Sequence, residues 1–395
     1  MIEIREEFLP IAVPDISDEE VEEVVEALRS GWISVGPKVK QFEEAMARRH
    51  GTRCAIAVSS CTAALFLVAK ALGIGPGDKA IVPSMSWPST ANIFEQLGAT
   101  AIFADVERST ANIIPETIEP LLQEHGGEVK AIVPVHMSGL PVDIESIEAL
   151  AAEYGVPVFY DAAHAVFSEY QGKPIGSFGL GSCFSFYAIK NLTCGDAGIV
   201  TTNDDELAEQ IRLWSYHGMN KDAWKRYSNE GGGPHVECVV PGYKLNLTDL
   251  HAALGIAQLR RADVLLAKRN KLVRTYNQLL EGMNDIEIPI HKTTEGKWGN
   301  HVYGIRLLDD SQDRNKVMDT LREYKVGTNI HFYPTHMHTF YRDKYPEVSL
   351  PNTEWLGERL ISLPLCSKYE SGDLEYVVAL LRQVLDSGIA VKDKK

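Results

Sequence analysis

The sequence lacks the features of several broad classes of protein. No run of about 18 apolar residues is long enough to span a bilayer, and the first residues lack the basic start and apolar stretch of a signal peptide. Asp and Glu (54) outnumber Lys and Arg (39), and the net charge of −15 disfavours nucleic acid and anionic membranes as partners. The six cysteines show no CxxC pair and no metal-ligand spacing, which indicates reduced thiols. We therefore expect a cytoplasmic protein without membrane insertion.

Short apolar segments alternate with helical patterns from residue 54 to about residue 200. This alternation predicts an α/β fold with a mostly parallel sheet and helices on both faces. A chain of 395 residues is long enough for two domains. We expect a large domain at 1–255 and a smaller α+β domain at 256–395, joined by one long helical pattern from Thr248 or Asp249 to Leu280. The expected strands lie at 54–58, 79–83, 100–105, 131–136, 156–161, 183–188 and 198–202.

One lysine, Lys190, follows the apolar strand pattern at 183–188. A lysine becomes a nucleophile when its pKa falls well below the usual value of about 10.4, and apolar surroundings have that effect. Phe184, Phe186 and Ile189 provide such surroundings. A surface lysine at a strand end is the common alternative, so the prediction of a reactive amine depends on residues elsewhere in the chain.

Asp161 stands at the end of the preceding expected strand, about thirty residues before the lysine. The carboxyl ends of parallel strands are where α/β sheets bind ligands. A carboxylate there, with a lysine after the next strand, is what pyridoxal phosphate (PLP) requires. The lysine forms a Schiff base with the aldehyde, and the carboxylate keeps the pyridine nitrogen protonated. A helix-capping or loop aspartate is the alternative.

A third segment could bind the phosphate of such a cofactor. The expected strand at 54–58 leads into Ser59, Ser60 and Cys61, and then into a helix that reaches about residue 72. Free amides and the positive end of the helix dipole suit a phosphate. The expected donors are the amides of Thr62 and Ala63, with the hydroxyl of Ser185 from beside the lysine. An ordinary Ser/Thr helix cap is the alternative.

These three parts, in this order, make the sequence resemble the DegT/StrS family of PLP-dependent sugar aminotransferases, which has the aspartate aminotransferase-like fold (fold type I). Within it, the chain is most similar to the branch that makes UDP-4-amino-4-deoxy-L-arabinose. Cys61 departs from the glycine or alanine common in the family, and Tyr333 from the arginine that this branch often carries nearby. The resemblance covers nearly the whole chain and depends on the segments at 31–37, 58–64, 161–164, 184–198, 242–249 and 350–353.

The resemblance implies further site residues. His164 would lie near the phenolic oxygen of the cofactor, Trp87 would stack on its ring, and Asn246 would reach across a homodimer interface to the neighbouring subunit's cofactor phosphate, giving shared active sites. The sugar pocket would contain Ser34, Gly36, His331 and Tyr333. Arg226, in a charged stretch before three glycines, is a candidate for a phosphate or carboxylate, although a solvated charge run is an equal alternative. We expect no metal, because the histidines at 331, 336 and 338 match no standard ligand spacing.

The implied reaction transfers an amino group from an amino acid, L-glutamate, to a keto sugar, most simply a nucleotide-linked 4-keto sugar used for surface polysaccharide, lipopolysaccharide or a secondary metabolite. Lys190 would act as general base and then acid. A free keto sugar, an octulosonate or a cyclitol is an alternative acceptor. Two other readings are a family dehydratase, which carries histidine in place of Lys190, and a non-catalytic binding or regulatory protein. Lys190 argues against the dehydratase, and Lys190, Asp161, His164 and Ser185 together argue against the non-catalytic protein.

Overall fold

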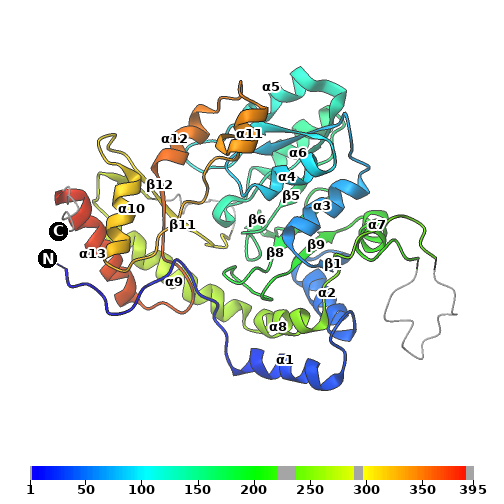
Figure 1. Ribbon diagram of the computed structural model, residues 1–395, viewed down its shortest axis with the longest axis horizontal. Coiled ribbons are helices and arrows are strands. Elements are labelled where there is room, and N and C mark those ends of the chain that lie inside the picture. Colours follow the sequence, from blue (N-terminus) through cyan, green and yellow to red (C-terminus); the bar gives the residue numbers. More distant parts are fainter. Residues whose placement is uncertain (1, 221–236, 289–296, 388–395) are drawn as a thin grey trace.

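The computed structural model describes residues 2–220, 237–288 and 297–387. At its centre is a seven-stranded, mostly parallel sheet, as the alternating pattern predicted (Figure 1). Two parallel bridges, Ile132–Val158 and Val135–Asp161, connect its two hydrogen-bonded parts, and β9 runs antiparallel to both of its neighbours. The spatial order is β3 (Thr100–Ala104), β2 (Lys79–Pro83), β4 (Val129–Ile132), β5 (Phe159–Asp161), β8 (Gly181–Ser185), β9 (Gly198–Thr202) and β1 (Cys54–Val58).

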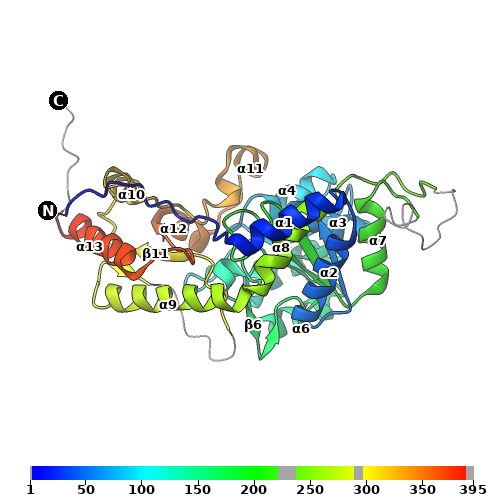
Figure 2. The same ribbon diagram turned by 90° about the horizontal axis from the view of Figure 1, so that it is seen from below.

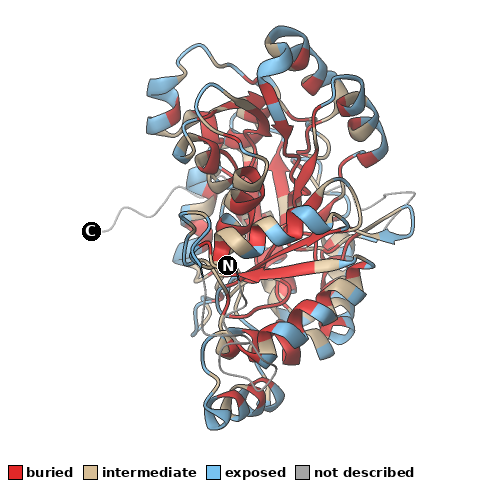
Figure 3. Cartoon of the chain, turned by 90° about the vertical axis from the view of Figure 1, so that its right-hand side faces the viewer, coloured by how far each residue is buried: buried red, intermediate tan, exposed pale blue. Residues whose placement is uncertain are grey.

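Helices surround this sheet, and its strands are mostly buried (Figure 3). β8 and β9 are buried along their whole length, which their apolar and small side chains allow. A short hairpin of β6 (Glu169–Tyr170) and β7 (Lys173–Pro174) lies outside the sheet. The helices of this part are α1 (Asp18–Ser30), α2 (Pro37–His50), α3 (Cys61–Ala71), α4 (Ser89–Gln96), α5 (Pro115–His125), α6 (Ile144–Glu153), α7 (Asp205–Ser215) and α8 (Asp249–Arg260).

The expected strands at 54–58, 79–83 and 198–202 coincide with β1, β2 and β9. β8 ends three residues earlier than expected, at Ser185, which pairs with Gly198 at the end of the ladder. Beyond it the chain turns, and the Lys190 N–H donates to the Tyr187 carbonyl at 2.9 Å. Lys190 therefore lies in a turn beyond the strand, not at the strand end.

The single helical pattern expected from Thr248 to Leu280 is two helices, α8 and α9 (Ala262–Leu280), because the backbone bends at Arg261. α9 leads into the C-terminal part, where the antiparallel sheet β10 (Ile286–Glu287), β11 (Tyr303–Leu307) and β12 (Leu360–Leu363) packs with helices (Figure 2). The helices that pack with this sheet are α10 (Arg314–Glu323), α12 (Pro351–Arg359) and α13 (Ser371–Ser387). α11 (Thr339–Lys344) lies against α4 instead, where the Tyr341 hydroxyl donates to Asn92 at 2.6 Å.

The C-terminal part has its own apolar core, which also includes Leu9. Leu9 bridges to Val326, so the first residues of the chain run along this part. The domain boundary after residue 255 stays a prediction. No helix within the described ranges is long and apolar enough to cross a membrane.

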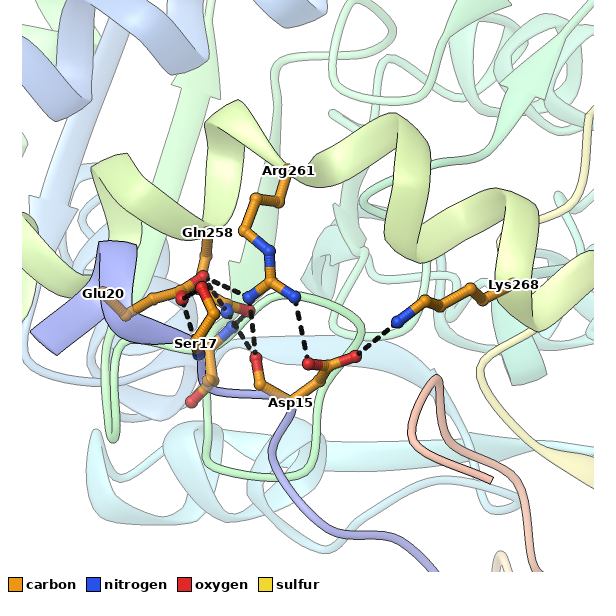
Figure 4. Close-up of polar contacts among 7 residues, drawn as sticks. Asp15, Ser17, Glu20, Gln258, Arg261 and Lys268 are labelled. Atoms are coloured by element: carbon orange, nitrogen blue, oxygen red, sulfur yellow. Dashed lines mark hydrogen bonds and ion pairs between the residues drawn. The ribbon is translucent and has the colours of Figure 1, made fainter. Parts of the chain in front are cut away.

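A buried polar network attaches α1 to the bend between α8 and α9 (Figure 4). Arg261 donates through Nη1 to Glu20 at 2.6 Å and through Nη2 to Asp15 at 3.0 Å. Gln258 donates to the same Glu20 oxygen at 2.7 Å, and the Ser17 amide donates to the other at 2.8 Å. The network therefore fixes the N-terminal helix to the point where the chain leaves the large sheet.

Candidate active site

Asp161 and the segment that carries Lys190 meet at one edge of the large sheet. β5 and β8 are parallel neighbours, and Asp161 is in register with Cys183. The carboxyl ends of both strands therefore lie side by side, as the sequence predicted for a ligand site.

The Asp161 carboxylate is buried and held by two hydrogen bonds. Its Oδ2 accepts from the Thr90 hydroxyl at 2.8 Å, and its Oδ1 accepts from the Ala163 amide at 3.0 Å. Burial raises the pKa of Asp161 above its usual value, whereas these two hydrogen bonds and the charge of Lys190 oppose the rise. Thr90 stands in the first turn of α4, so this helix orients the carboxylate. A cationic partner in the site would keep it ionised.

The Lys190 amine is half-buried and lies 3.5 Å from Nε2 of His301. Burial lowers the pKa of Lys190 to about 8, although the nearby Cys61 and Asp161 raise it. About a tenth of the amine is therefore neutral at pH 7, far more than for an ordinary lysine, and the neutral form is the one that attacks a carbonyl.

His301 is a site residue that the sequence did not reveal. Its Nδ1 lies 2.8 Å from Oδ1 of Asn191, whose own amide donates to the Gly299 carbonyl. The Asn191 oxygen thus requires the proton on Nδ1, which leaves the Nε2 lone pair facing Lys190. Burial, and then the charge of Lys190, lower the pKa of His301 well below its usual value. The only signal for His301 in the sequence was an isolated histidine in the expected strand at 299–307.

His164 lies against His301, with ring centroids 4.4 Å apart. The Ser138 amide donates to its Nδ1 at 3.3 Å, which places the ring proton of the neutral form on Nε2. Burial and the charge of Lys190 lower the pKa of His164 well below its usual value. His331, bonded through Nδ1 to the Ser362 hydroxyl at 2.8 Å, has its pKa lowered to about 4, chiefly by burial. The amine is therefore surrounded by neutral imidazoles.

The start of α3 offers amide donors close to these groups. Ser60 is the N-cap, and its hydroxyl accepts from the Ala63 amide at 3.1 Å. One of the two expected phosphate donors is thus bonded to the cap, and the helix geometry leaves the amides of Cys61 and Thr62 without an intrahelical acceptor. The Cys61 thiol donates to the Cys183 carbonyl at 3.5 Å, and burial raises its pKa well above the usual value.

Two further residues lie around this helix start. A Cβ on Gly198 would lie 2.2 Å from the Ser60 carbonyl oxygen, so only glycine lets β9 pack directly on the start of α3. Ser185, at the end of β8, accepts from the Tyr187 amide at 3.4 Å. The amine, the buried carboxylate, the histidine ring and the open amides are the donor set that PLP requires, and they fit that cofactor.

The expected sugar-binding residues fall into two groups. His331 belongs to the cluster around the amine, which consists of Lys190, His164, His301 and His331 and is called the Lys190 group below. Phe332, next to His331 in the chain, packs on His164 and on Trp87, which is 63% exposed. Tyr333 is also exposed. Arg226 lies outside the described residues.

The second group gathers at the start of α8. The Asp249 amide donates to the Ser34 carbonyl at 2.6 Å, and a Cβ on Gly36 would lie 2.5 Å from Asp249 Oδ2. Asn246 bridges to Val58, and its buried Oδ1 has no hydrogen-bond partner within the described part of the chain. The described contacts do not join Ser34, Gly36 or Asn246 to Lys190 within one chain.

The sheet order, the carboxylate after β5 and the amine after β8 define a PLP-dependent aminotransferase of fold type I. More specifically, the chain belongs to the DegT/DnrJ/EryC1/StrS aminotransferase family, whose model matches residues 14–382. It is 41% identical over 389 residues to the spore coat polysaccharide biosynthesis protein SpsC of Bacillus subtilis (strain 168), covering 98% of this chain and 99% of SpsC.

Solved structures agree with this assignment. The PMP form of the putative sugar aminotransferase Spr1654 from Streptococcus pneumoniae has a TM-score of 0.88 and 29% identity, covering 96% of this chain and 100% of that one, and a PLP form is also known. DesI, solved in the presence of its TDP-sugar product, has a TM-score of 0.86 and 28% identity, covering 97% of this chain and 94% of that one. The protein is thus a sugar aminotransferase with PLP as its cofactor.

Proposed function

We propose that this aminotransferase moves the amino group of L-glutamate to a nucleotide-linked 4-keto sugar, for surface polysaccharide, lipopolysaccharide or a secondary metabolite. The observation that carries the proposal is that a half-buried amine, Lys190 in the turn after β8, lies near the buried Asp161 carboxylate at the end of the adjacent strand β5. SpsC is a spore coat polysaccharide biosynthesis protein, and DesI was solved in the presence of its TDP-sugar product, which supports a sugar acceptor that is nucleotide-linked. The arabinose branch and a cytoplasmic location stay predictions.

We assign the cofactor to these residues. Lys190 would hold PLP covalently, the Asp161 carboxylate would keep its pyridine nitrogen protonated, and His164 would donate its Nε2 proton to the phenolic oxygen. Ser185 and the amides at the start of α3 would bind its phosphate. Bound PLP supplies an electron sink for the negative charge that develops at the donor's α-carbon.

Lys190 then performs the proton transfer of the reaction. Once the donor's amino group has replaced Lys190 on the cofactor, the released neutral amine of Lys190 would take the proton from the donor's α-carbon and return a proton at C4′. The Nε2 lone pair of His301 accepts a hydrogen bond from this amine and so holds it in the site. His301 is therefore a positioning residue for Lys190.

We also propose a homodimer with shared active sites. Ser34, Gly36 and Asn246 gather at the start of α8, without described contacts to Lys190 in their own chain. Exposed aromatic side chains, among them Trp87, Tyr187 and Tyr243, would be covered by a second subunit. Sedimentation of the purified protein tests the dimer. Mixing Lys190→Ala subunits with Asn246→Ala subunits tests sharing, because mixed dimers regain one intact site.

The activity is tested with purified protein, PLP and L-glutamate, and with a nucleoside-diphosphate 4-keto-6-deoxyhexose as acceptor. We expect the acceptor's keto oxygen to be replaced by an amino group, as read by mass spectrometry, and no product with Lys190→Ala. Lys173→Ala, which removes an exposed lysine, is the matched control. Amination of a free keto sugar, octulosonate or cyclitol, with the nucleotide-linked sugar unchanged, would overturn the proposed acceptor.

A further inference from the structure

A pocket lies between the large sheet and the C-terminal part, close to Lys190 and His301, and its volume is about 410 Å³ when the open solvent at its mouth is included. The large-sheet side provides the loop at 109–111 and the turn at 137–140, and the other side provides β11 and His331. We call it the Arg306 cavity, after the one arginine among its lining residues. These are Ser109, Thr110, Ala111, Met137, Ser138, Leu140, Trp298, Val302, Gly304, Arg306, His331 and Leu360.

Arg306 is a buried cation whose hydrogen bonds are incomplete. The residue is 5% exposed, and Nη2 donates to the Ser109 carbonyl at 2.9 Å. Nη1 forms an ion pair with the half-exposed carboxylate of Glu287 at 3.2 Å, and Nε has no hydrogen-bond partner within the described residues. A guanidinium presents its N–H groups in a fixed fork that suits a carboxylate, so the unused donors favour an anionic ligand.

The Arg306 cavity shares lining residues with a second cavity that lies next to the Lys190 amine. His331 and Val302 line both this cavity and a smaller one of about 280 Å³ that includes His301 and Ile189. His301 in turn contacts Lys190, and the Ser138 backbone contacts His164. The lining residues therefore lead from the amine, past His331, to Arg306.

We infer that Arg306 binds a carboxylate of the amino-acid donor in this cavity, between the large sheet and β11. The inference rests on the proposed function, since it concerns the donor of the same reaction. The carboxylate would complete the hydrogen bonding of the buried guanidinium, in place of or beside Glu287. Trp298 and Leu140 contribute apolar surface around the chain of the ligand. Neutral His331 adds no competing charge to the pocket.

The test uses PLP-loaded protein and glutarate, a dicarboxylate that cannot react because it has no amino group. Calorimetric titration should show that Arg306→Gln weakens glutarate binding at least about tenfold, as expected for the loss of a charged hydrogen-bonding partner. Arg306→Lys should restore part of the affinity. Arg314→Gln, which removes a partly buried arginine outside the cavity, should leave it unchanged.

Glu287→Gln is the second variant, and it stays informative if Arg306→Gln does not fold. Removing the negative charge of Glu287, which competes for Arg306, should tighten glutarate binding. This is the opposite of the effect of Arg306→Gln, and general damage to the fold does not produce it. Equal glutarate affinity in wild type, Arg306→Gln and Glu287→Gln would overturn the inference. So would loss of uridine diphosphate binding in Arg306→Gln with glutarate binding intact, since the arginine would then serve the sugar nucleotide.

The spectrum of the same samples separates the two proposals. If L-glutamate changes the cofactor absorption of wild type but Arg306→Gln binds glutarate as tightly as wild type does, the proposed donor stands and the inference about Arg306 fails. If L-glutamate leaves the wild-type spectrum unchanged, the proposed donor fails instead.

Discussion

The side chain of Lys190 combines burial with a neutral hydrogen-bond acceptor, His301, and this sets a measurable pH dependence. The pKa of about 8 predicts that cofactor-free protein reacts with PLP at a rate that rises with pH and levels off above about 8. Stopped-flow absorbance checks this. A rate that keeps rising to pH 10 would show an ordinary surface amine.

The same lowered pKa affects the stability of the cofactor-free protein. Between about 8 in the folded chain and the usual 10.5 in the unfolded chain, the unfolded state binds more protons. The contribution of Lys190 to stability therefore increases as the pH rises through this window. Lys190→Met should remove that increase.

Asp161 and Thr90 act as a pair at the residue scale. Asp161→Asn keeps the shape but removes the negative charge, and we expect PLP affinity and turnover to fall about 100-fold or more. Thr90→Val removes one hydrogen bond to that carboxylate and should cost about 1 to 2 kcal/mol, a roughly tenfold loss in PLP affinity. Equilibrium dialysis of PLP measures both. An Asp161→Asn protein with wild-type affinity would contradict the assigned role.

At the scale of elements, the sequence predicted the sheet and its order along the chain because apolar strands and helical patterns alternate regularly. The exact ends of the elements depend on local hydrogen bonding, which the apolar pattern does not show. β8 ends at Ser185, where its pairing with β9 ends, and the single helix expected at 248–280 is divided at Arg261 into α8 and α9. The positions of Asp161 at the end of a strand and of Lys190 shortly after one were predictable from the apolar pattern, and their roles stay proposals. His301 and Thr90 were not predictable, because long-range contacts alone bring them to the site.

The network at the end of α8 predicts a stability effect. Glu20 is fully buried, and burial would raise its pKa, but hydrogen bonds from Ser17 and Arg261 lower it below the usual 4.5. The stabilisation from its negative charge is therefore complete above pH 4.5 and is lost as the pH falls through the lowered pKa. Glu20→Gln leaves Arg261 with one carboxylate partner fewer and should lower the free energy of unfolding by about 2 to 3 kcal/mol.

Urea unfolding at pH 7 and at pH 4 measures this effect. Glu19→Gln, at the exposed neighbouring position, is the matched control and should change stability by less than about 0.5 kcal/mol. A Glu20→Gln protein as stable as wild type at pH 7 would mean that the network adds no net stability.

At the scale of the whole molecule, the site is built from both parts of the chain. The large sheet brings Lys190, Asp161 and His164, whereas His301 and His331 come from the C-terminal part. Burial of the amine therefore depends on how the two parts pack. The Arg306 cavity lies at the same junction, so the proposed donor site and the amine share residues of the C-terminal part.

The most direct test of the account is the absorption spectrum of the purified protein with PLP, before and after L-glutamate, beside Lys190→Ala and Lys173→Ala. We predict a band near about 420 nm that moves to about 330 nm with L-glutamate in wild type and in Lys173→Ala, and no such response in Lys190→Ala. A band of the same position and response in Lys190→Ala, or a wild type that binds no PLP, would contradict the central role of Lys190.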